Sequence, residues 1–384
     1  MRLLRLVHSL APSTGGVAEA IRQFGLAAES AGCALTVVTL DEPQADWLKG
    51  LPFRVVALGP CRNGYGYTAG LRPWLRKHVL SYDVVIVDGL WQYHGWAVWR
   101  EVRGRRPYFV MPHGMLDPWF KKHYPLKHLK KWLYWPWAEY RILRNATGVI
   151  FTAEEERRKA AHSFWLYCVK NEIIAPLGII KPDYDRAAGQ RQLEQIIPGL
   201  NNKPYLIFMG RLHEKKGVDL LIDAYRKLDA NRTQDLFQLV IAGPAGDEAY
   251  FNQLRRRAEG SAGIHFSGML HGDVKWAALA GAEALILPSH QENFGLVVVE
   301  TLAVGTPVLL SDKVDIWREV VEAGAGWVAP DSREGVFDLL NRFQSAERTD
   351  KPVIRQRVKQ CFEQHYRLDQ SVRHLMERLK HGLK

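Results

Sequence analysis

The chain has 384 residues, a length that predicts two or three domains at roughly 100 to 200 residues each. Hydrophobic residues make up 47% and charged residues 24% of the sequence, proportions typical of an ordinary globular protein, which excludes disordered, collagenous and coiled-coil chains. The formal net charge is +11, and a basic balance of this size raises nucleic acid or a membrane surface as a partner.

Short apolar runs alternate with amphipathic segments along almost the whole chain, the pattern of strand–helix units that build parallel sheets. The first series of predicted strands covers residues 3–7, 34–40, 53–58, 84–87, 108–111 and 148–151. The second series covers residues 205–209, 237–242, 264–266, 284–287 and 307–310. We therefore predict an α/β protein with two doubly wound, Rossmann-like sheets.

Residues 176–204 separate the two series and are rich in Pro, Gly, Asp and Gln, and three prolines interrupt any helix there. We predict that this segment is an interdomain linker, with one domain over residues 1–180 and a second over residues 181–364. After about residue 334 the apolar residues recur at helical spacing. We expect the last helix, at about 365–384, to cross back to the first domain.

In parallel α/β sheets ligands bind beyond the carboxyl ends of the strands, so the loops there are the first candidates for chemistry. After the first strand, Gly15 and Gly16 precede a helix and let an anion approach free backbone N–H groups. The spacing is not the GxGxxG of a dinucleotide fold, which argues against an NAD enzyme. After the strand at 108–111, Pro112-His113-Gly114 places His113 at the same edge. For the Gly15-Gly16 loop, the alternative is a turn that serves only the chain path. For His113, the alternative is a structural histidine.

The second series opens with a basic loop, residues 210–217, directly before a helix. Arg211 offers a planar fork of donors and Lys216 a mobile point charge, and together with a helix N-terminus they suit a diphosphate. The loop lacks the GKS/T ending of a Walker sequence and its magnesium-binding hydroxyl. A solvated basic loop is the alternative.

The most informative segment follows the strand at 284–287. Glu292 lies in the loop, and Glu300 lies about one turn inside the otherwise apolar helix that follows. A carboxylate is costly to bury unpaired, so we expect Glu300 to accept hydrogen bonds, most naturally from ligand hydroxyls. The backbone N–H groups of residues 293–297 at the helix start favour a phosphate.

Together these motifs resemble those of the family 4 retaining glycosyltransferases of GT-B fold, the group 1 glycosyl transferases. The resemblance rests on the E-x7-E segment from Glu292 to Glu300, Gly210-Arg211 with Lys216-Gly217, Pro112-His113-Gly114 and the Gly15-Gly16 loop. They follow the family's order over nearly the whole chain. Thr152-Ala153-Glu154-Glu155, interpreted as a capping box, lies where the family has a comparable helix start. The resemblance implies two Rossmann-like domains that face each other across a cleft.

By this resemblance the catalytic residues are His113, Glu292, Arg211 and Lys216. Arg211 and Lys216 would hold the donor diphosphate, Glu292 the hydroxyls of the donor sugar, and Glu300 those of the ribose. His113 would lie beside the reacting face of the sugar. The other donor-binding residues implied by the family act mainly through backbone groups: Gly15 and Gly16 at the phosphate, Asn293, Phe294, Gly295 and Leu296 at the sugar and phosphate, and Gly243, Gly268, Met269 and Leu270 at the base.

The implied reaction moves a hexose, with glucose preferred, from a nucleotide sugar to a saccharide or lipid-linked saccharide acceptor in polysaccharide or glycoconjugate synthesis. UDP is the expected nucleotide, although GDP-mannose and other donors share these motifs. The anomeric configuration would be retained through front-face attack guided by the departing diphosphate, whose charge fixed cations stabilise. We therefore expect no metal and no cofactor besides the nucleotide sugar. A covalent role for Glu292 is the alternative to hydroxyl binding.

Asp183-Tyr184-Asp185 matches the DxD of metal-dependent transferases only superficially, because it lies in the predicted linker and not at a strand end. Four scattered cysteines, Cys33, Cys61, Cys168 and Cys361, lack metal or redox spacing, which favours a reducing cytoplasm. No apolar run reaches the roughly 18 residues of a spanning helix. The first residues are too short an apolar stretch for a signal peptide, so we expect a cytoplasmic protein.

The positive charge is concentrated in the first half of the chain. Residues 1–180 hold 24 Lys and Arg against 14 Asp and Glu, whereas residues 181–384 hold 28 against 27. The densest part, residues 119–144, combines basic and aromatic side chains: Lys121, Lys122, Lys127, Lys130, Lys131, Arg141 and Arg144 with Trp132, Tyr134, Trp135 and Trp137. We expect this region to dock on an anionic membrane surface. A buried aromatic strip with a charged outer face is the alternative.

Two other functional classes compete with transfer. A basic nucleic-acid-binding protein would need a recognisable binding motif and a stacking platform, which the sequence lacks, and it leaves Glu292 and Glu300 unexplained. A nucleotide-sugar hydrolase or epimerase, or a phosphorylase, would keep the same fold. The sequence offers no lysine-anchored cofactor site, which disfavours the phosphorylase.

Overall fold

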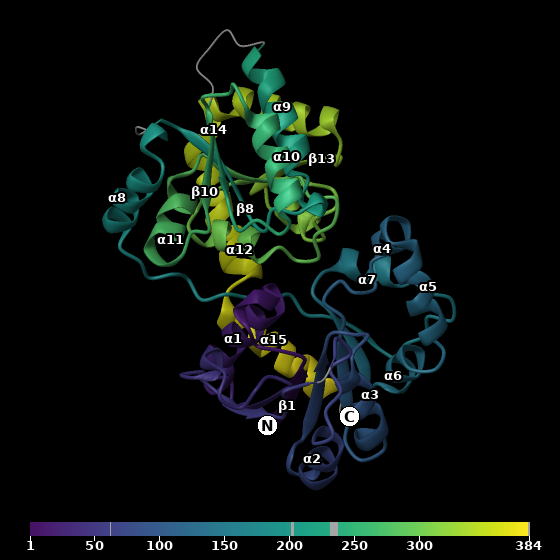
Figure 1. Cartoon of the computed structure of the whole chain (residues 1–384). Coiled ribbons are helices and arrows are strands. Elements are labelled where there is room, and N and C mark those ends of the chain that lie inside the picture. Colours follow the sequence, from purple (N-terminus) through teal and green to yellow (C-terminus); the bar gives the residue numbers. More distant parts are fainter. Residues whose placement is uncertain (62, 201–202, 231–236, 383–384) are drawn as a thin grey trace. The chain divides into compact units, whose positions relative to one another are not determined.

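The computed structural model describes residues 1–61, 63–200, 203–230 and 237–382 (Figure 1). The chain forms two compact units, one of Met1–Ile180 with Tyr366–Lys384 and the other of Lys181–His365. Each unit contains one parallel β-sheet with helices between successive strands. The prediction of two doubly wound α/β sheets is therefore confirmed.

The first unit has a seven-stranded sheet in the order β3-β2-β1-β4-β5-β6-β7. Its strands are β1 (Arg2–Val7), β2 (Ala34–Thr39), β3 (Arg54–Ala57), β4 (Val84–Asp88), β5 (Tyr108–Met111), β6 (Gly148–Phe151) and β7 (Glu172–Ile174). Its helices are α1 (Gly16–Ala28), α2 (Leu71–His78), α3 (Tyr93–Val102), α4 (Trp119–His123), α5 (Pro125–Tyr134), α6 (Glu139–Asn145), α7 (Glu154–Ala160) and α15 (Leu368–His381). The strand order reverses between β1 and β4, the switch point beside which ligands bind in such sheets.

The sheet of the first unit is buried on both faces because its strands are apolar at successive positions. Leu4 and Leu6 of β1 belong to the core cluster that includes residues of α2, α3 and α6. Leu3 and Val7 belong to the opposite cluster, to which α1 and α15 contribute. The helix α15, yellow in Figure 1, therefore closes the core of the first unit although it ends the chain.

The second unit repeats this topology in a six-stranded sheet of order β10-β9-β8-β11-β12-β13. Its strands are β8 (Tyr205–Met209), β9 (Gln238–Ala242), β10 (Ile264–Gly268), β11 (Ala284–Leu287), β12 (Val308–Ser311) and β13 (Gly326–Ala329). Its helices are α8 (Arg186–Ile196), α9 (Val218–Ala230), α10 (Glu248–Ala258), α11 (Gly272–Gly281), α12 (Leu296–Ala303), α13 (Trp317–Glu322) and α14 (Arg333–His365). The switch point lies between β8 and β11.

The expectation that prolines interrupt any helix in residues 176–204 is wrong, because the segment contains the helix α8. The prolines at 182 and 198 leave room between them for a helix, which begins after Asp185, whose side chain accepts the N–H of Ala188. Gly189 packs so closely on α11 that a Cβ there would lie 2.4 Å from the Asp273 carbonyl oxygen. Asp185 thus acts as a helix cap, which accounts for the second aspartate of the DxD-like segment.

The sequence patterns also missed two strands at sheet edges, β7 and β13. Both are short, and their side chains are mostly half-buried, so neither forms an apolar run. They are recognisable only from their pairing with β6 and β12. Among the described residues, no helix combines the length and the apolarity needed to cross a bilayer.

Candidate active site

The basic loop after β8 is fixed against the loop after β11. A short 3-10 turn, Glu214–Lys216, ends at Gly217, which has a φ of 64°. A Cβ at Gly217 would lie 2.1 Å from the Pro288 carbonyl oxygen, so only glycine allows this approach. The His290 N–H also donates to the Lys215 carbonyl at 2.8 Å. The local backbone therefore brings Lys216 to the segment that carries Glu292.

Lys216 and Glu292 form an ion pair. The two side chains are only 11% and 17% exposed. Burial, and to a smaller extent the charges of Lys215 and Arg211, lower the pKa of the Lys216 ammonium. Lys216 thus depends on a nearby anion to keep its charge, and in this structure Glu292 is that anion. A bound diphosphate would be a second anion suited to the same lysine.

Backbone hydrogen bonds hold the segment around Glu292 in place. The Glu292 N–H donates to the Lys313 carbonyl at 3.0 Å, and its own carbonyl accepts the Asp315 N–H at 3.0 Å. Gly295 follows with a φ of 69° and is the N-cap of α12, so the cap residue has no side chain to bind the N–H groups of the first turn. The Leu296 end of α12 therefore begins beside Glu292 with N–H groups suited to an anion. Phe294 is buried, so its ring belongs to the core.

Arg211 is exposed and forms no ion pair with a described residue. Its charge contributes to the lowered pKa of Lys216, so the two cations act on the same region. The backbone beside it is made compact by Gly243, where a Cβ would lie 1.9 Å from the Gly210 carbonyl oxygen. The Gly243 N–H donates to Gly268 at 2.8 Å. Glycines therefore lie at the ends of β8, β9 and β10, the region where we predicted that the base of the nucleotide binds.

The base region continues into α11. Met269 is 58% exposed, whereas Leu270 is buried. The sequence reasoning missed Lys275 of α11, whose ammonium lies 2.7 Å from Glu300 Oε1. Glu300 therefore has a protein partner, which the expectation of ligand hydroxyls alone did not include. The sequence signal for Lys275 was its position early in the helix that follows Gly268–Leu270. Its pairing with Glu300 of α12 can be seen only in the folded chain.

In the first unit, the loop after β1 is organised by Asp41. This carboxylate accepts hydrogen bonds from the Ser9 hydroxyl at 2.5 Å and the Leu10 N–H at 2.8 Å. The loop ends at Gly15, which has a φ of 81° and precedes α1. A Cβ at Gly15 would meet nothing within 4 Å. The space beside the start of α1, at Gly15 and Gly16, is therefore open within this unit.

His113 is held by a carboxylate that the sequence reasoning did not identify. Its Nε2 lies 2.8 Å from Asp88 Oδ1, and the imidazole is only 5% exposed. Arg5 binds the same carboxylate, with its Nε 2.9 Å from Asp88 Oδ2. Burial alone would raise the pKa of Asp88, but Arg5 and His113 hold it well below the usual range. The sequence signal was Arg5, a charge within an apolar strand that requires a buried partner.

The predicted capping box at Thr152 to Glu155 is displaced by one residue. The cap position is Ala153, and the glutamate that reaches back is Glu156 and not Glu155. Its carboxylate accepts the Thr152 N–H at 2.7 Å and the Gly114 N–H at 2.6 Å. The buried Glu156 thereby ties the loop that carries His113 to the end of β6.

The candidate residues thus form two groups, one in each unit. The second unit pairs Lys216 with Glu292, brings the charge of Arg211 near Lys216, and pairs Glu300 with Lys275. The first unit contains Gly15, Gly16 and His113. Among the described residues, no group of three or more His, Cys, Asp and Glu side chains is arranged to hold a metal ion.

Comparison with known families gives two matches that follow each other along the chain. The family described as "Glycosyl transferase 4-like domain" matches residues 15–166. The family described as "Glycosyl transferases group 1" matches residues 190–356. The first match falls in the first unit and the second match in the second unit.

A curated relative is the D-inositol 3-phosphate glycosyltransferase of Jonesia denitrificans, which is 27% identical over 207 residues, or 51% of this chain and 48% of that protein. The chain spans about half the length of this relative. The solved sucrose-phosphate synthase of Thermosynechococcus elongatus has a TM-score of 0.78 at 18% identity, covering 100% of this chain and 98% of that one. HepE of Anabaena, solved with UDP and glucose, has a TM-score of 0.74 at 17% identity over 99% and 100% of the two chains.

The structural neighbours show the GT-B type of fold with its two parallel sheets, and the two family matches together account for most of the residues. The chain belongs to the group 1 glycosyl transferases of the family 4 type.

Proposed function

We propose that the protein transfers a hexosyl group from a nucleotide sugar to a saccharide or lipid-linked saccharide, with retention at the anomeric carbon and without a metal. The observation that carries the proposal is the ion pair of Lys216 and Glu292 beside the start of α12, where the N-cap residue is a glycine. It combines a cation for a diphosphate with a carboxylate for sugar hydroxyls. Arg211 supplies a second cation close to the first.

The chemistry follows from the charges that develop during transfer. Negative charge grows on the departing diphosphate, and Arg211, Lys216 and the N–H groups of α12 would stabilise it. Lys216 would exchange part of its contact with Glu292 for the phosphate, which frees carboxylate oxygen for the hydroxyls of the donor sugar. Fixed cations supply the neutralisation that a divalent ion gives in other transferases.

The first unit would supply His113, whose ring is oriented by Asp88. A carboxylate at Nε2 favours the form in which this nitrogen carries a proton. Arg5 fixes the carboxylate in turn. His113 would therefore present its other edge in one orientation, as required of a group beside a reacting sugar.

UDP-glucose is the donor that we propose to test first. HepE, which shares the fold, was solved with UDP and glucose, and the donor residues implied by the family are all present in this chain. The Jonesia relative is named for transfer to D-inositol 3-phosphate. The acceptor that we propose for this chain is a saccharide, free or linked to a lipid.

Thermal unfolding of the full chain with UDP-, GDP- and ADP-sugars tests the donor site, because a ligand that binds the native state raises the midpoint with concentration. We expect a UDP-sugar to raise it and Arg211→Ala or Lys216→Met to reduce the effect. A charged hydrogen bond contributes about 1.5–3 kcal/mol, or roughly 10- to 100-fold in affinity. Arg255→Ala, an exposed change on α10, is the control. Equal responses of all three variants would refute the site.

Turnover assays test the remaining points. Transfer of radiolabelled glucose to an added acceptor separates a transferase from a hydrolase, which would release free sugar. The anomeric configuration of the product, measured by NMR, tests retention. Turnover that survives EDTA is expected, and complete loss that Mg²⁺ restores would overturn the metal-independent proposal.

We also propose that α5 and its surroundings dock on an anionic bilayer. Leu126, Leu133 and Trp137 are 78%, 59% and 70% exposed, and Lys130 and Arg141 are exposed beside them. Large apolar side chains with basic neighbours suit the headgroup region of a membrane. The alternative of a buried aromatic strip holds only for Trp135, which is fully buried. The side chains of Lys122 and Lys127 lie outside the described residues.

Sedimentation with liposomes tests the docking. The chain should bind vesicles rich in phosphatidylglycerol more strongly than vesicles of phosphatidylcholine, and Leu126→Ser with Leu133→Ser should weaken binding. Leu80→Ser is the matched control, because Leu80 is also about half exposed, at 52%, but lies outside the α5 region. Equal binding to both lipids would contradict the role of the basic residues.

A further inference from the structure

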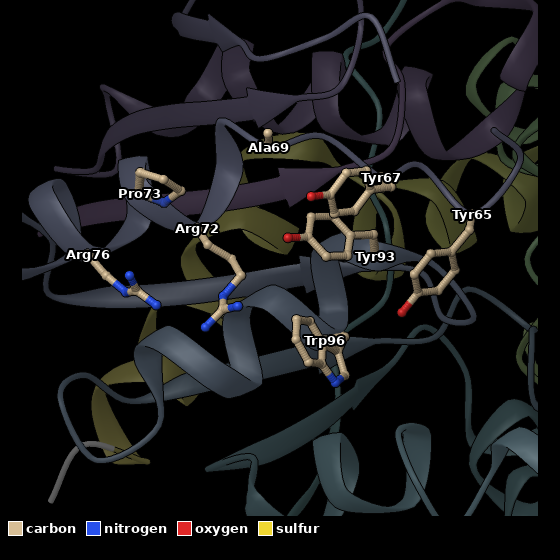
Figure 2. A pocket seen from close by; sticks show the side chains of 8 residues that line it. All are labelled: Tyr65, Tyr67, Ala69, Arg72, Pro73, Arg76, Tyr93 and Trp96. Atoms are coloured by element: carbon tan, nitrogen blue, oxygen red, sulfur yellow. The ribbon is translucent and has the colours of Figure 1, made fainter. Parts of the chain in front are cut away.

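A pocket of about 480 Å³ opens in the first unit, and none of the residues that the family motifs identify lines it. Its volume lies within the roughly 300–1,000 Å³ of small-molecule sites. The loop after β3, the first turns of α2 and the start of α3 form its walls (Figure 2). The lining residues are Tyr65, Tyr67, Ala69, Arg72, Pro73, Arg76, Tyr93 and Trp96.

One wall of the pocket is aromatic. The rings of Tyr67 and Tyr93 lie 4.9 Å apart between centroids, and Tyr93 stacks with Trp96 at 5.9 Å. Tyr67 remains 44% exposed. The Tyr93 N–H donates to the Tyr65 carbonyl at 2.8 Å, which fixes the loop to α3. Such ring faces are negatively polarised, so they attract the C–H groups on the apolar face of a sugar ring.

The part of the pocket next to this aromatic wall is cationic. Arg72 and Arg76 both donate to Glu101, with Nε to carboxylate distances of 2.6 Å each. Glu101 is only 7% exposed and does not line the pocket. Burial would raise its pKa, but the two arginines hold it below the usual range. Two guanidinium groups with one carboxylate leave a net charge of +1 at the pocket wall, where no acidic residue lies.

The two arginines differ in what they keep for a ligand, because Arg76 donates both Nε and Nη2 to Glu101, at 2.6 and 3.0 Å. The Glu101 carboxylate accepts a hydrogen bond from Nε of Arg72. The terminal nitrogens Nη1 and Nη2 of Arg72 donate to no described residue. The Arg72 guanidinium lies over the ring of Trp96, 5.3 Å from its centroid. Figure 2 shows Arg72 between Arg76 and Trp96. A planar fork held from behind is suited to a carboxylate or phosphate.

Contacts within the first unit link the elements around the pocket to the segments that carry the candidate site residues. A Cβ at Gly66 would lie 2.7 Å from His8 Nδ1, so the pocket loop touches the loop after β1 that leads to Gly15. On the other side, His94 of α3 binds the Asp88 carbonyl at 2.9 Å, and the Asp88 carboxylate holds His113. A ligand in the pocket would therefore lie at the same edge of the sheet as His113.

We propose that this pocket binds an anionic sugar of the acceptor, with the sugar ring on Tyr67, Tyr93 and Trp96 and its carboxylate or phosphate on Arg72 and Arg76. The inference rests on the proposed transfer reaction, because it names the part of the molecule that receives the hexose. An uncharged saccharide would leave the net charge of +1 of Arg72, Arg76 and Glu101 unbalanced, and a free phosphate would leave the aromatic wall unused.

Binding of small probes to the full chain tests the proposal without any donor. Glucuronic acid, glucose 6-phosphate, glucose and inorganic phosphate are titrated and followed by saturation-transfer NMR and by the tryptophan fluorescence. One or both charged sugars should bind at least tenfold more tightly than glucose and than phosphate. The comparison of glucuronic acid with glucose 6-phosphate then shows whether the pocket prefers a carboxylate or a phosphate. Binding of glucose or phosphate as tight as that of the charged sugars, or no binding of either charged sugar, would overturn the proposal.

Three variants locate the binding. Arg72→Gln should lower the affinity for the charged sugar at least tenfold, and Tyr67→Leu should lower it several-fold, since Tyr67 is exposed enough to change without loss of the fold. Lys77→Gln removes one positive charge from α2 at an exposed position outside the pocket and should leave affinity unchanged. Equal effects of Arg72→Gln and Lys77→Gln would show general charge attraction and refute the pocket.

The response to the donor separates this proposal from the proposed function. Arg72→Gln should keep the rise in unfolding temperature with the UDP-sugar, because Arg72 lies outside the donor residues. If no nucleotide sugar stabilises the wild type, the transfer reaction is refuted whatever the pocket binds. If the donor binds but the charged sugars do not, only the pocket assignment fails.

Discussion

The ammonium of Lys275 lies 2.7 Å from Oε1 of Glu300, and the two side chains come from α11 and α12. They are only 24% and 13% exposed. Glu300 is the carboxylate expected to bind the ribose hydroxyls, so its orientation depends on a lysine outside the family motifs. The ion pair uses Oε1 and leaves the second oxygen for a ligand.

Lys275→Met should therefore weaken donor binding. Loss of a hydrogen bond to a charged group costs about 1.5–3 kcal/mol, so we expect a fall of roughly tenfold or more in affinity for the nucleotide sugar. Lys275→Arg keeps the charge and should recover part of the loss. Isothermal titration with the UDP-sugar measures both. If Glu300→Ala abolishes binding while Lys275→Met leaves it intact, Lys275 has no role in orienting the carboxylate.

A second prediction concerns the stability cost of replacing two loop glycines, Gly243 and Gly15, by alanine. A Cβ at Gly243 would lie 1.9 Å from the Gly210 carbonyl oxygen, whereas one at Gly15 would meet nothing within 4 Å. Gly243→Ala should lower the free energy of unfolding by about 3 kcal/mol or more through overlap and backbone strain. Gly15→Ala should cost only the strain, about 1–2 kcal/mol. Urea unfolding compares them, and equal losses would contradict the role of the loop contact.

The strands that the sequence predicted to the residue are those in the middle of the sheets. Residues 108–111, 148–151, 205–209 and 284–287 are buried on both faces, so each forms an apolar run by itself. The edge strands β7 and β13 have no such run. The helix α8 differs from the expectation because Pro182 and Pro198 flank it and do not lie inside it. Local composition thus reveals buried elements better than edges.

The residues of the candidate site also differ in how well the sequence reveals them. Residues that act through adjacent backbone, such as Gly217 or Gly295, have a local signature, because a positive φ favours glycine. Side-chain pairs do not. Asp88 with His113 and Lys275 with Glu300 come from segments that only the folded sheet brings together. A charge inside an apolar run, as at Arg5, indicates that a buried partner exists but not which residue it is.

The Asp88 cluster gives a third prediction, on stability. Arg5 is 2% exposed, and Asp88→Asn would leave its charge buried without a counterion. Breaking a buried pair in this way costs about 3–5 kcal/mol, and urea unfolding at pH 7 should show a loss of this size. Because the folded-state pKa of Asp88 lies below its unfolded value, the stabilisation is present above about pH 4 and declines on further acidification. Asp88→Asn should lack that decline. A loss under 1 kcal/mol would contradict the argument.

Glu139 should make stability fall as the pH rises. Burial raises the pKa of this carboxyl to about 8, although the Trp91 N–H, 2.7 Å from Oε1, and Lys131 act in the other direction. The folded state therefore retains a proton that the unfolded chain, with an ordinary pKa near 4.5, has already lost. Between these two values the folded state binds more protons, so its stability declines as pH increases and the loss is complete above about pH 8.

The pH dependence of stability that Glu139 causes must be isolated by comparing the wild type with a variant, because His94 has the opposite effect. Burial lowers the pKa of His94 to about 4, so its contribution makes stability rise with pH up to about 6.5. Glu139→Gln keeps a neutral side chain that accepts the Trp91 N–H. Relative to the wild type, this variant should gain stability steadily from pH 5 to about pH 8 and then level off, by a few kcal/mol in total. Urea unfolding across this range measures the difference, and a difference that does not change with pH would show that Glu139 is already ionised in the folded protein.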